Sequence, residues 1–310
     1  PPARQCQLRF GAKRFAAHLS ADSHEACAAQ IRKDGFTVAR LGQDATVKDM
    51  ETVAMKLMGL EGSGGTYNGM GGVSRKNIGD TGFVDSSAGA PAEVTIQFHN
   101  EMAYATAFPK YVTFAMVKQA TTDGTTTLAD NLQVQGLMSA ALVEKFRSLG
   151  VLYVRLLHDE SDSASPDFYV SWQSAFTTKS LEEAMERGNR KETFSSLRRH
   201  DERRLKHTVW CPVFVQHEAH GEVFFNSVLN RHGSWLDHHA HFGKKPNHER
   251  PYHCLWGDGT ELSEAELKEV RDVYEASTLK IRLDAGDVLV VDNLRVVHGR
   301  TPYSGSRLLG

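Results

Sequence analysis

Two short segments of this sequence carry side chains that could bind one metal ion. In Phe98-His99-Asn100-Glu101, His99 and Glu101 are two residues apart, and alternate side chains of an extended segment project from the same face. A second imidazole, His298, lies far along the chain in Val297-His298-Gly299-Arg300. Two histidines and one carboxylate leave the opposite face of a metal open. That arrangement suits a non-haem Fe(II) oxygenase, because a chelating co-substrate and then O₂ can bind there.

Each half of this pattern is weak by itself. His-x-Glu recurs by chance at ordinary positions, and a lone histidine in a buried hairpin is often a core residue whose ring nitrogens bond to neighbours. Arg307 favours a site, because its strand is expected to return beside His298. An inward guanidinium in a β core is costly unless it meets an anion, and its planar fork fits the far carboxylate of 2-oxoglutarate.

The elements that must position these residues are mainly strands. Helices are expected at 21–33, 46–60, 132–148, part of 181–205 and 263–277, where Ser263 and Glu266 form a capping box. Strands are expected at 36–40, 95–101, 111–118, 125–129, 151–157, 168–172, 208–215, 223–226, 279–283, 287–292, around His298 and at 303–309. The glycine-rich segment 61–92 is expected to form a lid-like loop; it has no nucleotide-binding glycine motif.

Length alone allows one large domain or two average ones, and the composition is that of a soluble globular protein. We expect a single domain over residues 1–310, with a helical N-terminal flank over about 1–60. Charged residues make up 24% and the formal net charge is −2, so neither nucleic acid nor a membrane is an expected partner. A small-molecule substrate is expected, and a homo-oligomer is compatible with the sequence. The four scattered cysteines predict reduced, structural thiols. The start, Pro1-Pro2-Ala3-Arg4, has no hydrophobic signal core, so a cytoplasmic location is expected. The chain lacks an initiator Met, so its ends are expected to be trimmed and an upstream targeting segment stays open.

The chain resembles the taurine dioxygenase and clavaminate synthase-like family of Fe(II)/2-oxoglutarate oxygenases. The resemblance extends from about Gly35 to the last residue and rests on blocks that occur in the family's order. These blocks are His99-Asn100-Glu101-Met102-x-Tyr104, Phe108-Pro109, Asp123-Gly124-Thr125-Thr126-Thr127-Leu128-Ala129-Asp130, Ser171-Trp172-Gln173, Gly257-Asp258-Gly259, and Asp292-Asn293 through His298-Gly299-Arg300 to Arg307.

The resemblance implies a mainly β fold, a double-stranded β-helix or jelly roll, with flanking helices. It implies that His99, Glu101 and His298 bind Fe(II), and that Thr126 and Arg307 bind the distal carboxylate of the co-substrate 2-oxoglutarate. The family usually has Gly-Gly-Glu-Thr where this chain has Asp123-Gly124-Thr125-Thr126, so the threonine is retained. Related halogenases replace the carboxylate ligand by a small residue, so Glu101 favours hydroxylation or another hydrogen-abstraction outcome over halogenation.

The implied function is a dioxygenase that uses Fe(II), 2-oxoglutarate and O₂ and releases succinate and CO₂. The expected outcome is hydroxylation of a small polar substrate, amino-acid-like or an amine. Desaturation, cyclisation or demethylation at the same iron stay open, as does a non-catalytic jelly-roll binding module. The two classes differ in whether Fe(II) and 2-oxoglutarate form a coloured complex.

Substrate contacts are expected where family members place them, at Tyr67, Asn68 and Arg75 in the lid-like loop, and also at Trp172 and Asn226. For each of these, loop packing or a structural hydrogen bond is the competing interpretation. A group of histidines near residue 240 suggests a second metal site, but no regular element fixes ligand geometry there. A surface histidine-rich loop is therefore the preferred interpretation for His238, His239 and His241, with His232 and His248 nearby.

Overall fold

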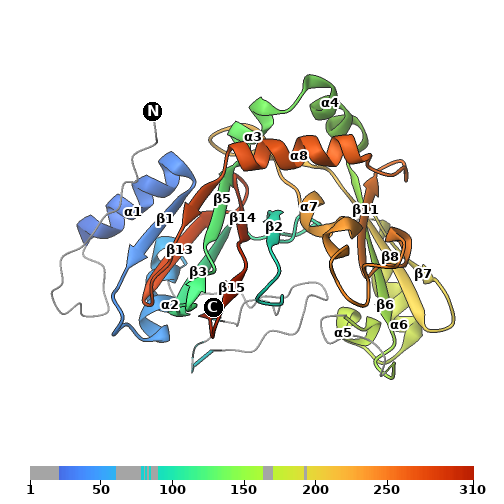
Figure 1. Ribbon diagram of the computed structural model, residues 1–310, viewed down its shortest axis with the longest axis horizontal. Helices are drawn as coiled ribbons and strands as arrows, with labels where there is room; N and C mark the ends of the chain where they lie inside the picture. The colour runs from blue at the N-terminus through green and yellow to red at the C-terminus, as the bar shows by residue number, and fades with distance from the viewer. Residues whose placement is uncertain are drawn as a thin grey trace.

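Two four-stranded antiparallel sheets form the centre of the computed structural model, which describes residues 21–60, 78, 79, 81, 84, 90–162, 170–191 and 194–310. The first sheet has the order β1 (Phe36–Arg40), β13 (Asp287–Asp292), β3 (Tyr111–Lys118) and β16 (Leu308–Leu309). The second has the order β12 (Leu279–Ile281), β5 (Thr126–Asp130), β14 (Val296–Arg300) and β2 (Ile96–His99). Both lie in the left half of Figure 1.

Successive strands alternate between these two sheets: β2, β3 and β5 do so first, and β13, β14 and β16 do so again. Apolar side chains of both sheets pack together in one core, among them Met116, Leu128, Leu289 and Val296. This winding is a double-stranded β-helix, so the predicted jelly roll with flanking helices is confirmed. A short two-stranded sheet joins β4 (Thr122–Asp123) to β15 (Tyr303–Ser304) near one end.

Helices α1 (Ala21–Asp34) and α2 (Val47–Leu57) cover the outer face of the first sheet. Ile31 and Met50 pack there against Ala39 and Val288. Helix α2 begins with a capping box in which Thr46 and Asp49 bond to each other's backbone amides, which satisfies two amides that lack helical partners.

A long insertion between β5 and β12 builds the right half of Figure 1. Its main sheet has the order β11 (Tyr252–Trp256), β6 (Val151–His158), β8 (Arg204–Cys211) and β7 (Ser195–Arg199), and a hairpin joins β9 (Phe214–His217) to β10 (Gly221–Phe224). Its helices are α3 (Asn131–Leu137), α4 (Ala140–Leu149), α5 (Trp172–Phe176), α6 (Leu181–Gly188), α7 (Val228–Arg231) and α8 (Glu264–Ala276). Two 3₁₀ turns, Gly233–Leu236 and Asn247–Glu249, follow α7.

The insertion shares a core with the outer face of the second sheet. Ala129 of β5 and Val297 of β14 belong to the same apolar cluster as Tyr153, Trp256 and Tyr274 from the insertion. This shared cluster agrees with the single-domain expectation, which stays a prediction.

Several elements differ from the sequence-based predictions, and the reasons are local. The helix expected at 132–148 is two helices, because the Ser139 side chain caps a new start at α4. The strand expected at 168–172 is wrong at its end, since Ser171 caps helix α5. Only the first part of 181–205 is helical; the rest enters β7 and β8, and β11 was not predicted.

Cys27, Cys211 and Cys254 are buried free thiols, in line with the expected structural role, and Cys6 lies outside the described residues. Burial raises the pKa of Cys211 to about 12, so this thiol stays protonated. No helix in the described part of the chain is long and apolar enough to cross a bilayer. Most of the expected lid-like loop also lies outside the described residues.

Candidate metal centre

The two histidines face each other across the edge of the second sheet. His99 is the register partner of His298 where β2 pairs with β14, and the ring centroids are 4.2 Å apart. His298 lies on the same side of β14 as Val296, so its ring points into the core between the sheets, where it packs 4.9 Å from Phe114 of β3. The sheet register therefore brings together two residues that are remote in sequence.

Glu101 completes the group from a turn. The strand ends at His99, and Met102 has a positive φ of 60°, so the extended segment expected through Glu101 is wrong beyond His99. Even so, Oε2 of Glu101 lies 3.9 Å from Nε2 of His99 and 3.9 Å from Nε2 of His298. The three donor atoms all lie within 4.8 Å of one another, close enough to surround one ion.

The hydrogen bond of His99 leaves the correct nitrogen available for a metal. Its Nδ1 lies 2.8 Å from the carbonyl oxygen of Gln97, which can only accept, so Nδ1 carries the proton. The lone pair is then on Nε2, the atom nearest Glu101. Metal-binding histidines almost always donate their second ring N–H in this way.

Gly299 allows β2 and β14, the strands that carry His99 and His298, to approach each other closely. A Cβ at this position would lie 2.7 Å from the carbonyl oxygen of Ile96 in β2 and 2.8 Å from Oγ1 of Thr127 in β5. Only glycine fits without moving a strand, and the register of β14 shifts between His298 and Arg300. The role of this glycine was not predicted, although it directly follows a ligand in the sequence.

Two buried asparagines hold the turn that carries Glu101. Oδ1 of Asn293 accepts the Glu101 N–H at 2.7 Å, while Nδ2 of Asn293 donates to the carbonyls of Glu101 (3.1 Å) and Pro109 (2.8 Å). The side chain of Asn100 points away from the ligands, as expected, and its Oδ1 accepts from Asn131 and from the Asn226 N–H. The family blocks contained both asparagines, but sequence reasoning gave them no role.

Arg307 lies directly before β16, the edge strand of the first sheet. A Cβ on Gly124 would lie 3.5 Å from Cδ of Arg307, so this arginine runs beside the segment that leads into Thr126. Thr126 is buried and lies on the same side of β5 as Leu128, toward the core between the sheets. Nε of Arg307 is buried and has no hydrogen-bond partner in the described structure, and burial followed by the nearby Arg300 lowers the pKa of this guanidinium. A partly buried guanidinium whose Nε has no partner among the described residues fits a carboxylate ligand.

Arg300 lies close to Arg307 but is used differently. Its guanidinium packs 4.8 Å from the ring of Tyr303, and that of Arg307 lies 5.5 Å from the same ring. Arg300 donates 2.7 Å hydrogen bonds to the carbonyls of Pro91 and Val94, so its terminal nitrogens hold the chain before β2. Arg307 is therefore the better candidate for an anionic ligand.

A second group, His232, His253 and Glu261, also has ligand-type atoms within 4.8 Å of one another. Its hydrogen bonds disfavour a metal. Nδ1 of His253 accepts the Gly233 N–H at 3.1 Å, so the ring proton is on Nε2, which donates to Glu261 at 2.9 Å. This tautomer is the opposite of that of His99.

The other histidines of the expected histidine-rich loop fit a surface loop. His238, His241 and His248 are exposed, and His239 is partly exposed. His232 is the exception, because it is buried beneath this loop.

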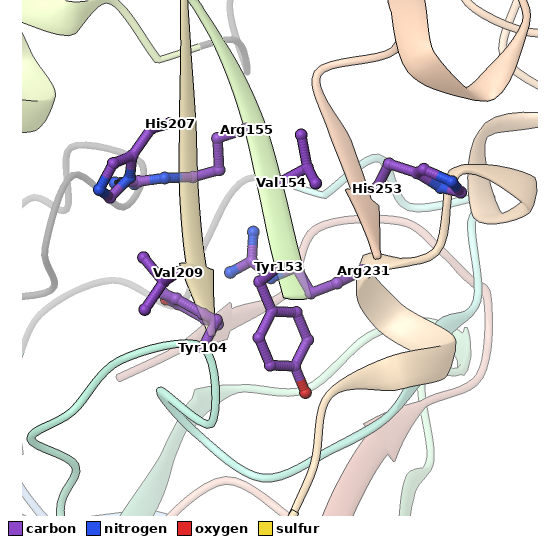
Figure 2. A pocket seen from close by; sticks show the side chains of 8 residues that line it. All are labelled: Tyr104, Tyr153, Val154, Arg155, His207, Val209, Arg231 and His253. Atoms are coloured by element: carbon purple, nitrogen blue, oxygen red, sulfur yellow. Dashed lines mark hydrogen bonds between the residues drawn. The ribbon is translucent and has the colours of Figure 1, made fainter. Parts of the chain in front are cut away.

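A narrow pocket opens between the turn that carries Glu101 and Tyr104 and the main sheet of the insertion (Figure 2). Tyr153 and Arg155 of β6 lie on the same side of the sheet as their register partners on β8, and Tyr104 closes the pocket from the turn after Glu101. The lining contains two arginines, two histidines and no carboxylate: Tyr104, Tyr153, Val154, Arg155, His207, Val209, Arg231 and His253. Its side chains favour a polar, negatively charged group.

The arginines of this pocket are held in fixed positions. Arg155 donates to Nδ1 of His207 at 3.0 Å, and Nε2 of His207 bonds to Ser195 Oγ at 2.8 Å. Burial, and then the neighbouring Arg155, lower the pKa of His207 to about 3, so the imidazole is neutral and can accept. The Arg231 guanidinium packs 4.0 Å from the ring of Tyr104 and 4.7 Å from that of Tyr252.

Two of the expected substrate residues are described, and neither lines this pocket. The side chain of Asn226 is fully buried, donates to Tyr274 Oη at 2.8 Å and accepts from the Val228 N–H at 3.0 Å. These contacts agree with the competing interpretation of Asn226, a structural hydrogen bond. Trp172 is buried and donates to Asp159 at 3.1 Å. Tyr67, Asn68 and Arg75 lie outside the described residues.

Comparisons with known proteins agree with this geometry. Residues 3–309 match the model of the family described as taurine catabolism dioxygenase TauD, TfdA family. The dapdiamide synthesis protein DdaC of Enterobacter agglomerans is 28% identical over 233 residues, which cover 72% of this chain and 67% of that protein. A clavaminate synthase-like protein of Arabidopsis thaliana is 27% identical over 224 residues, covering 70% and 64%. The chain thus spans about two thirds of the length of these relatives.

Among solved structures, asparagine oxygenase with Fe(II), 3-hydroxyasparagine and succinate has a TM-score of 0.50 at 14% identity, covering 94% of this chain and 78% of that one. At this identity the likeness shows the fold alone. The family match covers nearly the whole chain, and the facing histidines, the nearby carboxylate and the desolvated arginine fit iron and 2-oxoglutarate. The chain belongs to the TauD/TfdA family and is a non-haem Fe(II)- and 2-oxoglutarate-dependent dioxygenase.

Proposed function

We propose that His99, Glu101 and His298 hold the Fe(II) and that the enzyme hydroxylates a small polar, amino-acid-like substrate. The observation that carries the metal assignment is the convergence of three donor atoms within 4.8 Å, with the proton of His99 on the nitrogen that faces Gln97. When bound, iron and 2-oxoglutarate together activate O₂ for oxidation of a C–H bond, with release of succinate and CO₂.

We assign Arg307 and Thr126 to the distal carboxylate of 2-oxoglutarate. Arg307 supplies a desolvated guanidinium whose Nε has no partner in the described structure. Thr126 supplies a buried hydroxyl on the strand that pairs with β14, on the face toward which His298 points. An arginine fork and a hydroxyl together satisfy a carboxylate in a site from which water is largely excluded.

The pocket beside Tyr104 supports a substrate that carries a carboxylate or another anionic group. Two fixed guanidinium groups, Arg155 and Arg231, lie in its lining, and Tyr104 follows the ligand Glu101 by three residues. Holding the charged end of a substrate there would place the rest of the molecule toward the metal turn. Asparagine oxygenase, which shares the fold, binds a hydroxylated amino acid, and DdaC takes part in dapdiamide synthesis. The lid-like loop, with Tyr67, Asn68 and Arg75, remains part of this proposal.

The first experiment tests whether His99, Glu101 and His298 hold the metal. Anaerobic addition of Fe(II) and 2-oxoglutarate should give a visible charge-transfer band, and His99→Ala should abolish it. Absence of the band in the unmodified protein would contradict the metal assignment.

The second experiment tests the substrate. Amino acids and small amines are screened for stimulation of succinate release, each amino acid beside its methyl ester. Free carboxylates should stimulate release and their esters should not. Arg231→Gln should raise KM about 10- to 150-fold, the loss of one hydrogen bond to a charged group. Arg198→Gln, at an exposed arginine of strand β7 that does not line the pocket, is the control. Equal stimulation by acids and esters would refute the anionic pocket.

The outcome of the reaction is part of the same proposal. Hydroxylation adds one oxygen atom to the substrate, whereas desaturation or cyclisation removes two hydrogen atoms and demethylation releases formaldehyde. Mass spectrometry of the product from the best substrate distinguishes these outcomes.

A further inference from the structure

Asn293 makes three side-chain hydrogen bonds around the turn that carries Glu101. Its Oδ1 accepts the Glu101 N–H at 2.7 Å, and its Nδ2 donates to the Glu101 carbonyl at 3.1 Å and to the Pro109 carbonyl at 2.8 Å. The side chain is fully buried. One asparagine therefore occupies both backbone groups of a single residue, Glu101.

Glu101 needs such a support because the sheet does not supply one. The hydrogen-bonded strand ends at His99, and the backbone turns through a left-handed conformation at Met102. A ligand beyond the end of a strand is not fixed by the β ladder, whereas His99 and His298 are fixed by their register. The position of the carboxylate therefore depends on contacts outside the sheet.

The asparagine is itself anchored to the hairpin that carries His298. Asn293 lies between β13 and β14, its N–H donates to the Lys110 carbonyl at 2.9 Å, and its own carbonyl accepts from Asn100 Nδ2 at 2.5 Å. These hydrogen bonds, which we call the Asn293 clamp, connect the turn that carries Glu101 with the hairpin that carries His298. It sets the place of the carboxylate relative to both imidazoles.

We propose that Asn293 is a positioning residue that preorganises Glu101 for the metal. The inference rests on the proposed metal site and adds to it a residue that touches neither the metal nor the substrate. Residues that orient metal ligands in this way typically change metal affinity by about 10- to 100-fold when they are mutated.

Metal affinity in the full chain tests this role. Mn(II) is titrated by calorimetry into metal-free protein without 2-oxoglutarate, and the thermal midpoint of the metal-free protein is measured beside it. Asn293→Ala should raise the Kd for Mn(II) about 10- to 100-fold. Asn293→Asp is the second variant: it keeps the acceptor for the Glu101 N–H but turns a carboxylate oxygen toward two carbonyls, so its Kd should rise as well.

The chain contains a control asparagine with the same bonding pattern, at an exposed position in the insertion. Asn189 makes the same set of bonds, accepting the Leu197 N–H at 2.9 Å and donating to the carbonyls of Leu197 (2.9 Å) and Met185 (2.7 Å). Asn189→Ala removes an equal number of hydrogen bonds of the same type and should leave the Kd for Mn(II) within about twofold, as expected for distant, independent sites.

The outcomes separate the clamp from the metal site itself. If the unmodified chain binds Mn(II) and both Asn293 variants bind it equally well, the positioning role is overturned and the metal site stands. If the unmodified chain binds no metal, the metal site and the clamp both fail. If both variants fail to fold, Asn293 serves the stability of the hairpin as a whole and the proposal also fails.

Discussion

Replacing Arg307 by methionine should have opposite effects on stability and on 2-oxoglutarate binding. The Arg307 guanidinium is partly buried, its Nε has no hydrogen-bond partner among the described residues, and it lies 5.5 Å from the ring of Tyr303. Methionine fills similar space without a charge. The substitution therefore removes an unfavourable burial from the free protein and a favourable contact from the complex.

The magnitudes follow from these contacts. Leaving a buried polar group unpaired costs about 1–3 kcal/mol, and a cation over an aromatic ring returns about 0.5–1 kcal/mol. Arg307→Met should then leave the unfolding free energy of the free protein unchanged or raise it by up to about 2 kcal/mol. In the complex, loss of one partner of a buried charge pair costs about 2–5 kcal/mol, which corresponds to a 30- to 5,000-fold rise in Kd.

Two measurements check this prediction. Urea unfolding of metal-free, ligand-free protein gives the stability, and titration of 2-oxoglutarate into the anaerobic Fe(II) protein gives the Kd from the charge-transfer band. Arg300→Met is the matched control, because Arg300 packs on the same ring but donates to the carbonyls of Pro91 and Val94. That variant should be destabilised by about 2–4 kcal/mol.

The reasoning would be refuted by either of two results. One is a free Arg307→Met protein that is less stable than the parent by more than about 1 kcal/mol, beyond the cation–π contribution. The other is a Kd for 2-oxoglutarate that changes less than about threefold, below the energy of one charged hydrogen bond.

Two further predictions concern packing and pH. Gly299→Ala should push β14 away from β2 and Thr127, which should lower stability by about 1–3 kcal/mol and weaken Mn(II) binding. The control is Gly136→Ala in helix α3, where a Cβ would have no neighbour within 4 Å, and this variant should be neutral or stabilising. Equal effects of the two substitutions would contradict the close-approach argument. Burial and Arg155 lower the pKa of His207 from 6.5 to about 3, so between these pH values the imidazole binds a proton only in the unfolded chain. The stability of the fold should therefore fall as the pH drops from about 6.5 toward 3, by up to about 1.4 kcal/mol per pH unit. Urea unfolding at several pH values should show a shallower dependence for His207→Gln, and an unchanged slope would argue against the neutral buried imidazole.

The three proposed metal ligands could be predicted from the sequence because their chemistry is encoded in short blocks. His99, Glu101 and His298 were identified from residue type, spacing and order along the chain, and their donor atoms do lie together. Helices with capping boxes, such as α8 after Ser263, were also predictable, since their signals lie within four residues. Local patterns failed where one side chain redirected the chain, as at Ser139 and Ser171.

The supporting residues were not predictable from the sequence, because their partners are remote. Asn293 is 192 residues from Glu101, and Gly299 matters only because β2 and β5 flank β14. The same holds for hydrogen bonds that choose a tautomer: His99 and His253 are both histidines near a carboxylate, yet only the folded backbone gives them opposite ring protons.

The sequence by itself therefore determined the family, the jelly roll and the three donor side chains. The tertiary structure decided which ring nitrogen of each histidine carries the proton, how Arg307 lies beside Tyr303 and how Glu101 is held beyond the end of its strand. The physical reason is that donor chemistry belongs to a residue, whereas burial, register and hydrogen-bond direction arise only when distant segments pack together.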